Sequence, residues 1–201
     1  MTPKNKHKHF WTLKRKAILI GALSTLLIVA FLGITTKLRK DELELRQIKT
    51  QNVVNRDVQK VAEYAMSCNS KLWPSLANEI ATAIVNSSLT YKVPLDILVG
   101  IVAVESEFNI FVVSKANAKG LCQVRFESWP EIKVENVYEP EQNCNSAAWI
   151  LNRLIKEHKL KKAIELYNIG EGNFKKGVRN REYVSKIFEK SAEFRYFDTR
   201  K

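Results

Sequence analysis

The sequence predicts an all-α protein, in which a single transmembrane helix and a helical stem precede a helical globule. Three observations support this fold class. Apolar residues recur at helical spacing in several segments, prolines stand at helix starts, and no strand of any length is evident. The length of 201 residues is enough for one globular domain with an appendage.

Residues 1–16 form a basic leader, and residues 17–36 predict a transmembrane anchor. A helix needs about 20 apolar residues to cross the hydrocarbon core of a membrane, and the stretch from Ala17 to Thr36 carries no charge. A cleaved signal peptide is the alternative, but its apolar core is about 7–15 residues long and ends at a small-residue site. The exit of this segment, FLGITTKLRK, offers no such site. We therefore expect an uncleaved anchor, with the leader in the cytoplasm and residues 37–201 outside it.

The net charge of +12 does not indicate a nucleic-acid partner. Residues 1–40 contain nine basic side chains and no acidic one, so residues 41–201 carry only +3. A nucleic-acid-binding domain would need a basic patch on its folded part. The basic residues instead flank the apolar segment, and we expect no nucleic-acid partner.

Residues 37–65 predict a stem, and residues 66–201 predict the globular domain. The stem is charged, poor in apolar residues, and free of Gly and Pro from Asp41 to Val61. In the domain, Pro74 and Pro94 each stand in the first turn of an expected helix, and the second of these helices ends near Glu107. Residues 110–130 are expected to be loop. Further helices are expected over 145–158, from 161 until Gly170 and Gly172 stop it, and over 181–194.

Glu105 is the candidate catalytic residue, because it continues an apolar helix face. By helical spacing it lies on the same face as Leu98, Ile101 and Val102, whereas Glu107 points elsewhere. Burial and the negative end of the helix both disfavour a charged carboxylate, so both raise its pKa. A carboxyl group that holds its proton near neutral pH is what a general acid for glycosidic cleavage needs. The alternative is an exposed glutamate at a helix end without a role.

Four short motifs resemble those of the lytic transglycosylases with a soluble-lytic-transglycosylase domain, a lysozyme-like family. The resemblance covers about residues 75–195, in the order and spacing of the family. The matching residues of the first motif are Glu105, Ser106, Phe108, Ser114, Ala118, Gly120, Leu121 and Gln123. The others are Glu139, Pro140, Asn143, Ala147 and Leu151, then Tyr167, Asn168, Gly170 and Gly172, and finally Tyr183 and Val184.

The chain departs from the first motif at four positions. Ile110 stands where the family has proline, and Asn117 where it has glycine. Asn117 tolerates left-handed backbone better than most residues. Cys122 replaces a methionine before Gln123, and Arg125 replaces a residue that is often methionine in the sugar site.

The resemblance implies a reaction with one catalytic carboxyl group. Glu105 would protonate the glycosidic oxygen between N-acetylmuramic acid and N-acetylglucosamine, then act as a base on the sugar's own 6-hydroxyl. The product is a 1,6-anhydro end, and no water is consumed. A second carboxylate would instead indicate a hydrolytic muramidase, and four carboxylates stay open as such a partner: Glu127, Glu131, Glu165 and Glu171.

The resemblance also implies roles around Glu105. Ser114, Gln123, Tyr167 and Arg125 would bind substrate, and the Tyr167 hydroxyl would orient Glu105. For Ser114 and Gln123 the alternative is hydrogen bonding to local loop backbone, and for Tyr167 it is a buried aromatic with a satisfied hydroxyl. Ser106 and Asn168 would support the site. In the stretch that carries these motifs, no residue pattern calls for a metal or a cofactor.

The three cysteines leave two interpretations open. Cys68 and Cys144 could form a disulfide outside the cytoplasm, or both could be buried free thiols. Cys122 is expected to fill the place of the family's apolar methionine.

The sequence therefore predicts a lytic transglycosylase anchored in the inner, cytoplasmic membrane by a single pass, with its domain on the periplasmic, cell-wall side. Its partners would be peptidoglycan glycan strands and the membrane. An inactive glycan-binding or scaffold module of a secretion, conjugation or phage-entry apparatus is the alternative from another functional class.

Overall fold

The computed structural model describes the backbone of residues 3–198 and the side chains of residues 31–198. The chain divides into two compact units, Met1–Asn52 and Val53–Lys201. The first helix, α1, spans Pro3–Cys68. The predicted leader and residues 17–30 of the predicted anchor lie outside the described side chains. Over the part of the chain whose side chains are described, no helix combines the length and the apolar character needed to cross a membrane.

The second unit begins within the predicted stem. Val61, Tyr64 and Ala65, near the end of α1, are buried in the core of this unit. The Tyr64 ring packs edge-on against the rings of Phe108 and Phe194, with centroids 6.1 and 5.5 Å apart. The end of the predicted stem, 37–65, is therefore part of the globule.

The named elements in the described part of the second unit are all helices, which confirms the all-α prediction and is consistent with a lysozyme-like fold. The helices are α2 (Pro74–Tyr91), α3 (Leu95–Glu105), α4 (Pro140–Glu157), α5 (Leu160–Lys175) and α6 (Arg181–Tyr196), with a short 3-10 helix, η1 (Phe126–Ser128). The loop from 106 to 125 contains two isolated β-bridges, which join Lys119 to Val113 and to Val124.

The helix α4 differs most from its predicted bounds. α4 begins five residues before the expected Asn145, because the Glu139 carboxylate accepts the N–H groups of Glu141 and Gln142 at 3.0 and 2.6 Å. Pro140 occupies the first turn, where its missing N–H costs nothing. In α5, the backbone at Gly170 is not helical, with φ of 73° and ψ of 155°, so the first helical segment ends there as predicted and a second one continues to Lys175.

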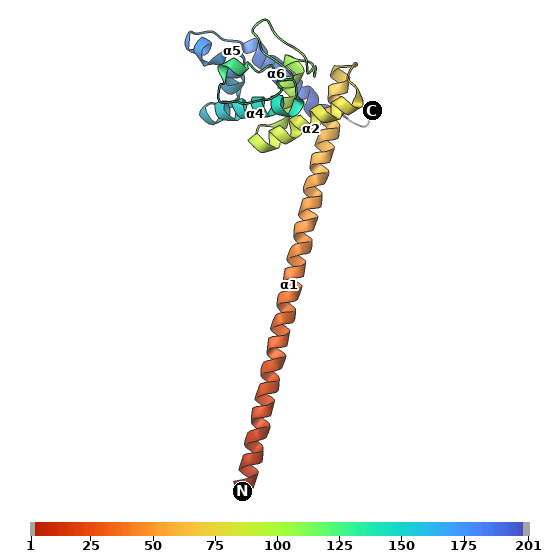
Figure 1. The fold of residues 1–201 in the computed structure, drawn as a ribbon, viewed down its shortest axis with the longest axis vertical. Helices are drawn as coiled ribbons and strands as arrows, with labels where there is room; N and C mark the ends of the chain where they lie inside the picture. The colour runs from red at the N-terminus through yellow and green to blue at the C-terminus, as the bar shows by residue number, and fades with distance from the viewer. Residues whose placement is uncertain (1–2, 199–201) are drawn as a thin grey trace. The chain divides into compact units, whose positions relative to one another are not determined.

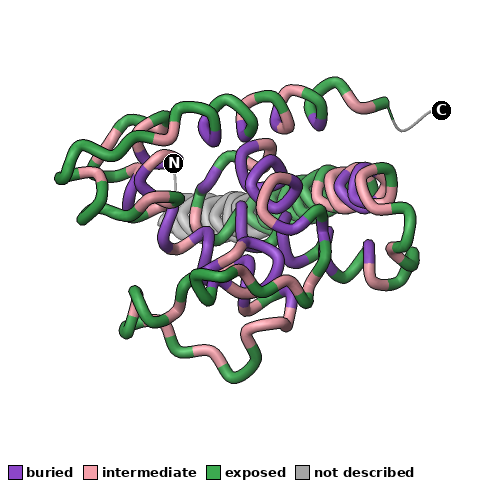
Figure 2. The backbone as a smooth tube through the Cα atoms, turned by 90° about the horizontal axis from the view of Figure 1, so that it is seen from above, coloured by how far each residue is buried: buried purple, intermediate pink, exposed green. Residues whose placement is uncertain are grey.

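α3 is the central helix of the second unit. Every residue from Ile97 to Ala103 is buried, as expected for a helix that is apolar on all sides. α3 packs against α6, and α2 packs against α4, beside which it lies in Figure 1. Figure 2 shows the buried segments gathered inside this unit, with exposed segments around them.

Gly100 allows α6 to approach α3 closely. A Cβ at this position would lie 2.8 Å from the Ile187 carbonyl oxygen and from the Ser191 hydroxyl. Ser191 Oγ also donates to the Asp96 carbonyl at 2.9 Å, which ties the two helices together. This close packing brings the first turn of α6 to the end of α3, where Glu105 lies.

Candidate active site

Glu105 is the last residue of α3, and its side chain is half-buried. Burial raises the pKa of its carboxyl group from the ordinary 4.5 to about 7. A carboxyl group with this pKa is partly protonated at neutral pH and can act as a general acid.

The chain reverses direction immediately after Glu105. Ser106 is buried at the helix end, and its hydroxyl donates to the Val102 carbonyl at 3.2 Å. Glu107 and Phe108 both adopt left-handed backbone, with φ of 50° and 60°. Such conformations are costly for residues other than glycine and persist only where the surroundings impose them. Here the Phe108 side chain is completely buried, which anchors the turn beside Glu105.

The hydroxyl of Tyr183, in the first turn of α6, donates a hydrogen bond of 2.7 Å to Glu105 Oε1. This bond favours the charged carboxylate and so lowers the pKa of Glu105, against the larger effect of burial. Asn180 caps α6 by accepting the Tyr183 N–H at 3.0 Å. Sequence reasoning assigned no role to Tyr183, although the Tyr183-Val184 match to the family was the signal for one.

The Tyr167 hydroxyl does not make the predicted hydrogen bond to Glu105. The Tyr167 hydroxyl, from α5, donates to the backbone carbonyl of Cys122 at 2.7 Å. Tyr167 therefore holds the loop beside the site, while Tyr183 holds Glu105.

Ser114 and Gln123 both bond to local backbone. The Ser114 hydroxyl accepts the N–H groups of Ala116 and Ala118 at 3.2 and 3.1 Å. Gln123 has left-handed backbone, with φ of 50°, and its amide donates to the carbonyls of Val112 and Gly120 at 3.0 and 3.1 Å. Both side chains thus shape the loop between α3 and η1.

Arg125 and Asn168 are both exposed. Arg125 directly precedes η1. The Asn168 side chain accepts a hydrogen bond of 2.9 Å from the Asn180 side chain. Asn168 thereby supports the cap of α6 and, through it, the position of Tyr183.

The four other carboxylates considered as partners of Glu105 are engaged elsewhere. Glu131 pairs with Arg153 at 2.8 Å, and Glu171 pairs with Lys175 at 3.0 Å. Glu165 accepts the Asn180 N–H at 2.9 Å, and Glu127 accepts a hydrogen bond from the Asn117 side chain. None of them contributes to the pKa shift of Glu105, whose causes are burial and Tyr183. Over the described part of the chain, no group of His, Cys, Asp and Glu side chains could hold a metal ion.

Cys68 and Cys144 do not form a disulfide. All three thiols are free, and the sulfur that lies beside Cys144 Sγ is that of Cys122, at 3.9 Å. Cys122 and Cys144 are completely buried, whereas Cys68, at the end of α1, is partly exposed.

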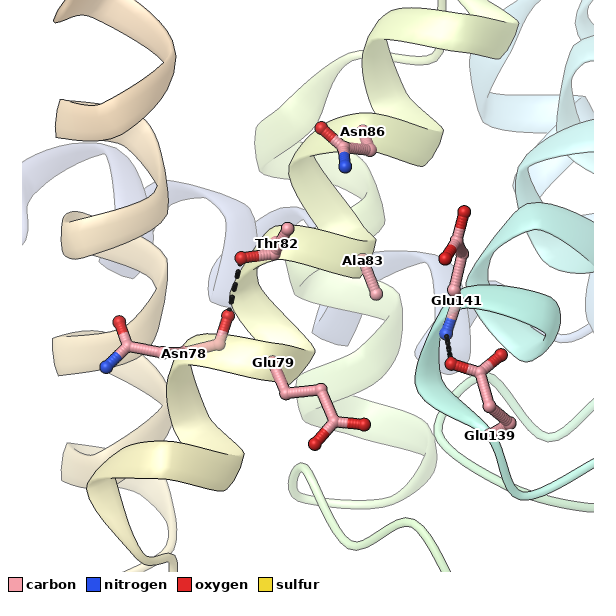
Figure 3. Close-up of a pocket in the computed structure, with 7 residues that line it drawn as sticks. All are labelled: Asn78, Glu79, Thr82, Ala83, Asn86, Glu139 and Glu141. Atoms are coloured by element: carbon pink, nitrogen blue, oxygen red, sulfur yellow. Dashed lines mark hydrogen bonds between the residues drawn. The ribbon is translucent and has the colours of Figure 1, made fainter.

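A cavity of about 280 Å³ lies between α2 and the start of α4 (Figure 3). Its lining includes the carboxylates of Glu79, Glu139 and Glu141. It contains none of the predicted site residues, and the Glu139 carboxylate is occupied in capping α4 (Figure 3). We therefore assign the candidate site to Glu105 and not to this cavity.

A family model described as the transglycosylase SLT domain matches residues 82–188, more than half of the chain. This match includes Glu105, the loop that follows it, and Tyr183. A comparison with curated proteins finds no significant match. The chain therefore belongs to the transglycosylase SLT domain family, which indicates a function of the lytic transglycosylase type on peptidoglycan.

Proposed function

We propose that the protein cleaves the β-1,4 bond between N-acetylmuramic acid and N-acetylglucosamine in peptidoglycan and leaves 1,6-anhydro-muramic ends. The observation that carries this proposal is the environment of Glu105 within a transglycosylase SLT domain. Its carboxyl group is half-buried, has a pKa of about 7, and accepts a hydrogen bond from Tyr183.

One carboxyl group serves both halves of the reaction. The neutral Glu105 donates its proton to the glycosidic oxygen, and the bond between that oxygen and the muramic C1 breaks. The resulting carboxylate then takes the proton of the muramic 6-hydroxyl, whose oxygen bonds to C1. The proton that Glu105 loses in the first half returns in the second, so no water is consumed.

Tyr183 supports the second half of this cycle. Its hydroxyl stabilises the carboxylate that forms once Glu105 has given up its proton. Burial favours the neutral acid and Tyr183 favours the base, so the pKa stays near neutrality, where both protonation states are accessible.

Water-dependent cleavage is less well supported by the arrangement of carboxylates. Hydrolytic glycosidases of the two-carboxylate type place a second acid about 5–10 Å from the first. The four candidates here are each held by an arginine, a lysine, an asparagine or a backbone N–H.

A membrane anchor over residues 17–36, with the domain on the cell-wall side, belongs to the same proposal. It is supported by the length of the uncharged segment. It is also supported by Phe31, Leu32 and Ile34, described residues of that segment whose large apolar side chains are exposed. Burial of such side chains in lipid would remove them from water.

The products of murein digestion test the proposed reaction. Murein incubated with the full-length protein is expected to release fragments whose muramic ends are lighter by one water than reducing ends, as mass spectrometry would show. Murein incubated without protein is the control. Reducing ends would instead show a muramidase, and murein that binds the protein but is never cut would show a scaffold module.

A further inference from the structure

The buried thiols of Cys122 and Cys144 face each other across the loop and α4. Their sulfur atoms are 3.9 Å apart, and neither side chain is accessible to solvent. This is the distance of a weak thiol contact, about 1.9 Å longer than the roughly 2.0 Å of a disulfide bond. Cys68 is half-buried and lies in a different environment, beside Tyr64 and Ser67.

The backbone around this pair is fixed by Asn143, the residue before Cys144. Its side-chain oxygen accepts the Cys122 N–H at 2.9 Å. Its amide group donates to the carbonyls of Lys119 and Val137 at 3.0 and 2.8 Å. The loop is thus bound to the first turns of α4 immediately beside the two sulfurs.

Gly120 makes this approach possible. A Cβ at Gly120 would lie 2.3 Å from the Asn143 amide nitrogen, a distance that no side chain can occupy. The proximity of the two thiols therefore follows from the backbone packing of the loop on α4, and not only from the rotamers of two cysteines.

We propose that Cys122 and Cys144 form a disulfide when the domain folds in an oxidising compartment. The expectation of such a compartment rests on the location proposed above. The oxidant would be a disulfide, either of a small molecule or of a thiol oxidase. One cysteine thiolate attacks it and releases a thiol, and the second thiolate then displaces the other thiol and forms the Cys122–Cys144 bond. The two cysteines lose two electrons and two protons, and the oxidant is reduced to two thiols.

The burial of both sulfurs places this reaction during folding. A folded domain would shield both thiols from an oxidant, and their mutual contact and burial raise the pKa of Cys122, which disfavours the reactive thiolate. The bond would tie the loop to α4 at the residue whose carbonyl holds Tyr167. The alternative is a pair of permanently free thiols that fill the core.

Counting free thiols tests the proposal. The full-length protein, in a mild detergent, is reduced, unfolded, and refolded with a mixture of reduced and oxidised glutathione. It is then unfolded with an alkylating reagent and weighed by mass spectrometry. The expected result is one label per chain, on Cys68, and three labels after reduction. Three labels without reduction, or a cross-linked peptide that contains Cys68, would overturn the proposal.

The variant Cys68→Ser is the matched control. It is expected to carry no label after refolding and two after reduction, because it retains both paired cysteines. A disulfide between residues 122 and 144 is also expected to make the thermal unfolding midpoint of the oxidised protein roughly 10 °C higher than that of the reduced protein. Equal midpoints in the two states would count against the cross-link. The thiol count does not depend on murein cleavage, so a cross-linked protein that leaves murein uncut would contradict the proposed function alone.

Discussion

At Glu105, two effects shift the pKa of the carboxyl group in opposite directions. Burial raises the pKa of the carboxyl group, and the hydroxyl of Tyr183 lowers it by a smaller amount. The net value of about 7 leaves the group able to give and to take a proton near neutral pH. This balance, rather than the presence of a glutamate, makes the residue suited to the proposed reaction.

Glu105 is expected to make stability depend on pH. Its pKa is about 7 in the folded protein and near 4.5 when unfolded, so folding favours the protonated form. The contribution is fully present below about pH 4.5 and is lost as pH rises through 7. Glu105→Gln removes this dependence. The free energy of unfolding of the variant minus that of the wild type is therefore expected to be higher at pH 8 than at pH 5, by at most about 3 kcal/mol. Urea unfolding at both pH values measures this, and parallel pH dependence of the two proteins would contradict it.

Tyr183→Phe is expected to shift the pH profile of activity to higher pH. The substitution keeps the ring and removes only the donor to Glu105 Oε1, so the pKa of Glu105 rises further. The alkaline limb of the rate of murein cleavage measures this pKa. Tyr167→Phe is the control, because its hydroxyl donates to Cys122 and not to Glu105. If the alkaline limb of both variants lay at the wild-type pH, Tyr183 would not contribute to the pKa of Glu105.

Sequence patterns identified the candidate acid but not all of its neighbours. Helical spacing placed Glu105 on the buried face of α3, and the structure shows it half-buried there. A motif match places a tyrosine near the site, but it does not show which acceptor the hydroxyl reaches. Tyr167, on α5, reaches a loop carbonyl, whereas Tyr183, on α6, reaches the carboxyl group.

At the scale of elements, the loop between α3 and η1 depends on its packing against α4. Gly120 has φ of 77° and lies against Asn143. Gly120→Ala is expected to destabilise the domain by about 3 kcal/mol or more, because it adds both backbone strain and a clash. Gly172→Ala is the matched control, since a Cβ there meets nothing within 4 Å. Thermal unfolding of both variants measures the difference, and similar midpoints would contradict this account of the loop.

Helix starts follow the sequence signals only in part. Pro74 opens α2 as expected, whereas α4 begins at Pro140 and not at the predicted Asn145. Its cap is Glu139, a less common capping residue than Ser, Thr, Asp or Asn. Gly170 is predicted to end the helix that begins near residue 161, and its non-helical backbone does end that segment before a second helical segment follows. The earlier start of α4 arises because hydrogen bonds formed in the fold override local preference.

At the scale of the whole second unit, the end of α1 belongs to the core. Tyr64 packs between Phe108 and Phe194, and its hydroxyl reaches Glu193 on α6 at 3.2 Å. The sequence did not indicate this, because only two turns at the end of a long charged helix carry the buried residues. The packing of such a short apolar stripe is decided by the residues it meets in the fold.

A fragment of residues 53–201 is therefore expected to fold, and a fragment of residues 69–201 is not. The shorter fragment loses Val61, Tyr64 and Ala65, each buried. A large apolar side chain contributes about 1.5–3 kcal/mol when buried, against a total stability of about 5–15 kcal/mol. Circular dichroism during heating would show a cooperative transition for the longer fragment only. A cooperative transition of equal midpoint in both would show that α1 is dispensable.

The rate of murein cleavage by Glu105→Gln tests the account as a whole. The amide cannot donate or accept the required proton, so the rate is expected to fall by about 10²–10⁴-fold. Glu171→Gln, which removes an exposed carboxylate that pairs with Lys175, is expected to cut murein at the wild-type rate. Cleavage by Glu105→Gln at the wild-type rate would show that Glu105 is not the acid.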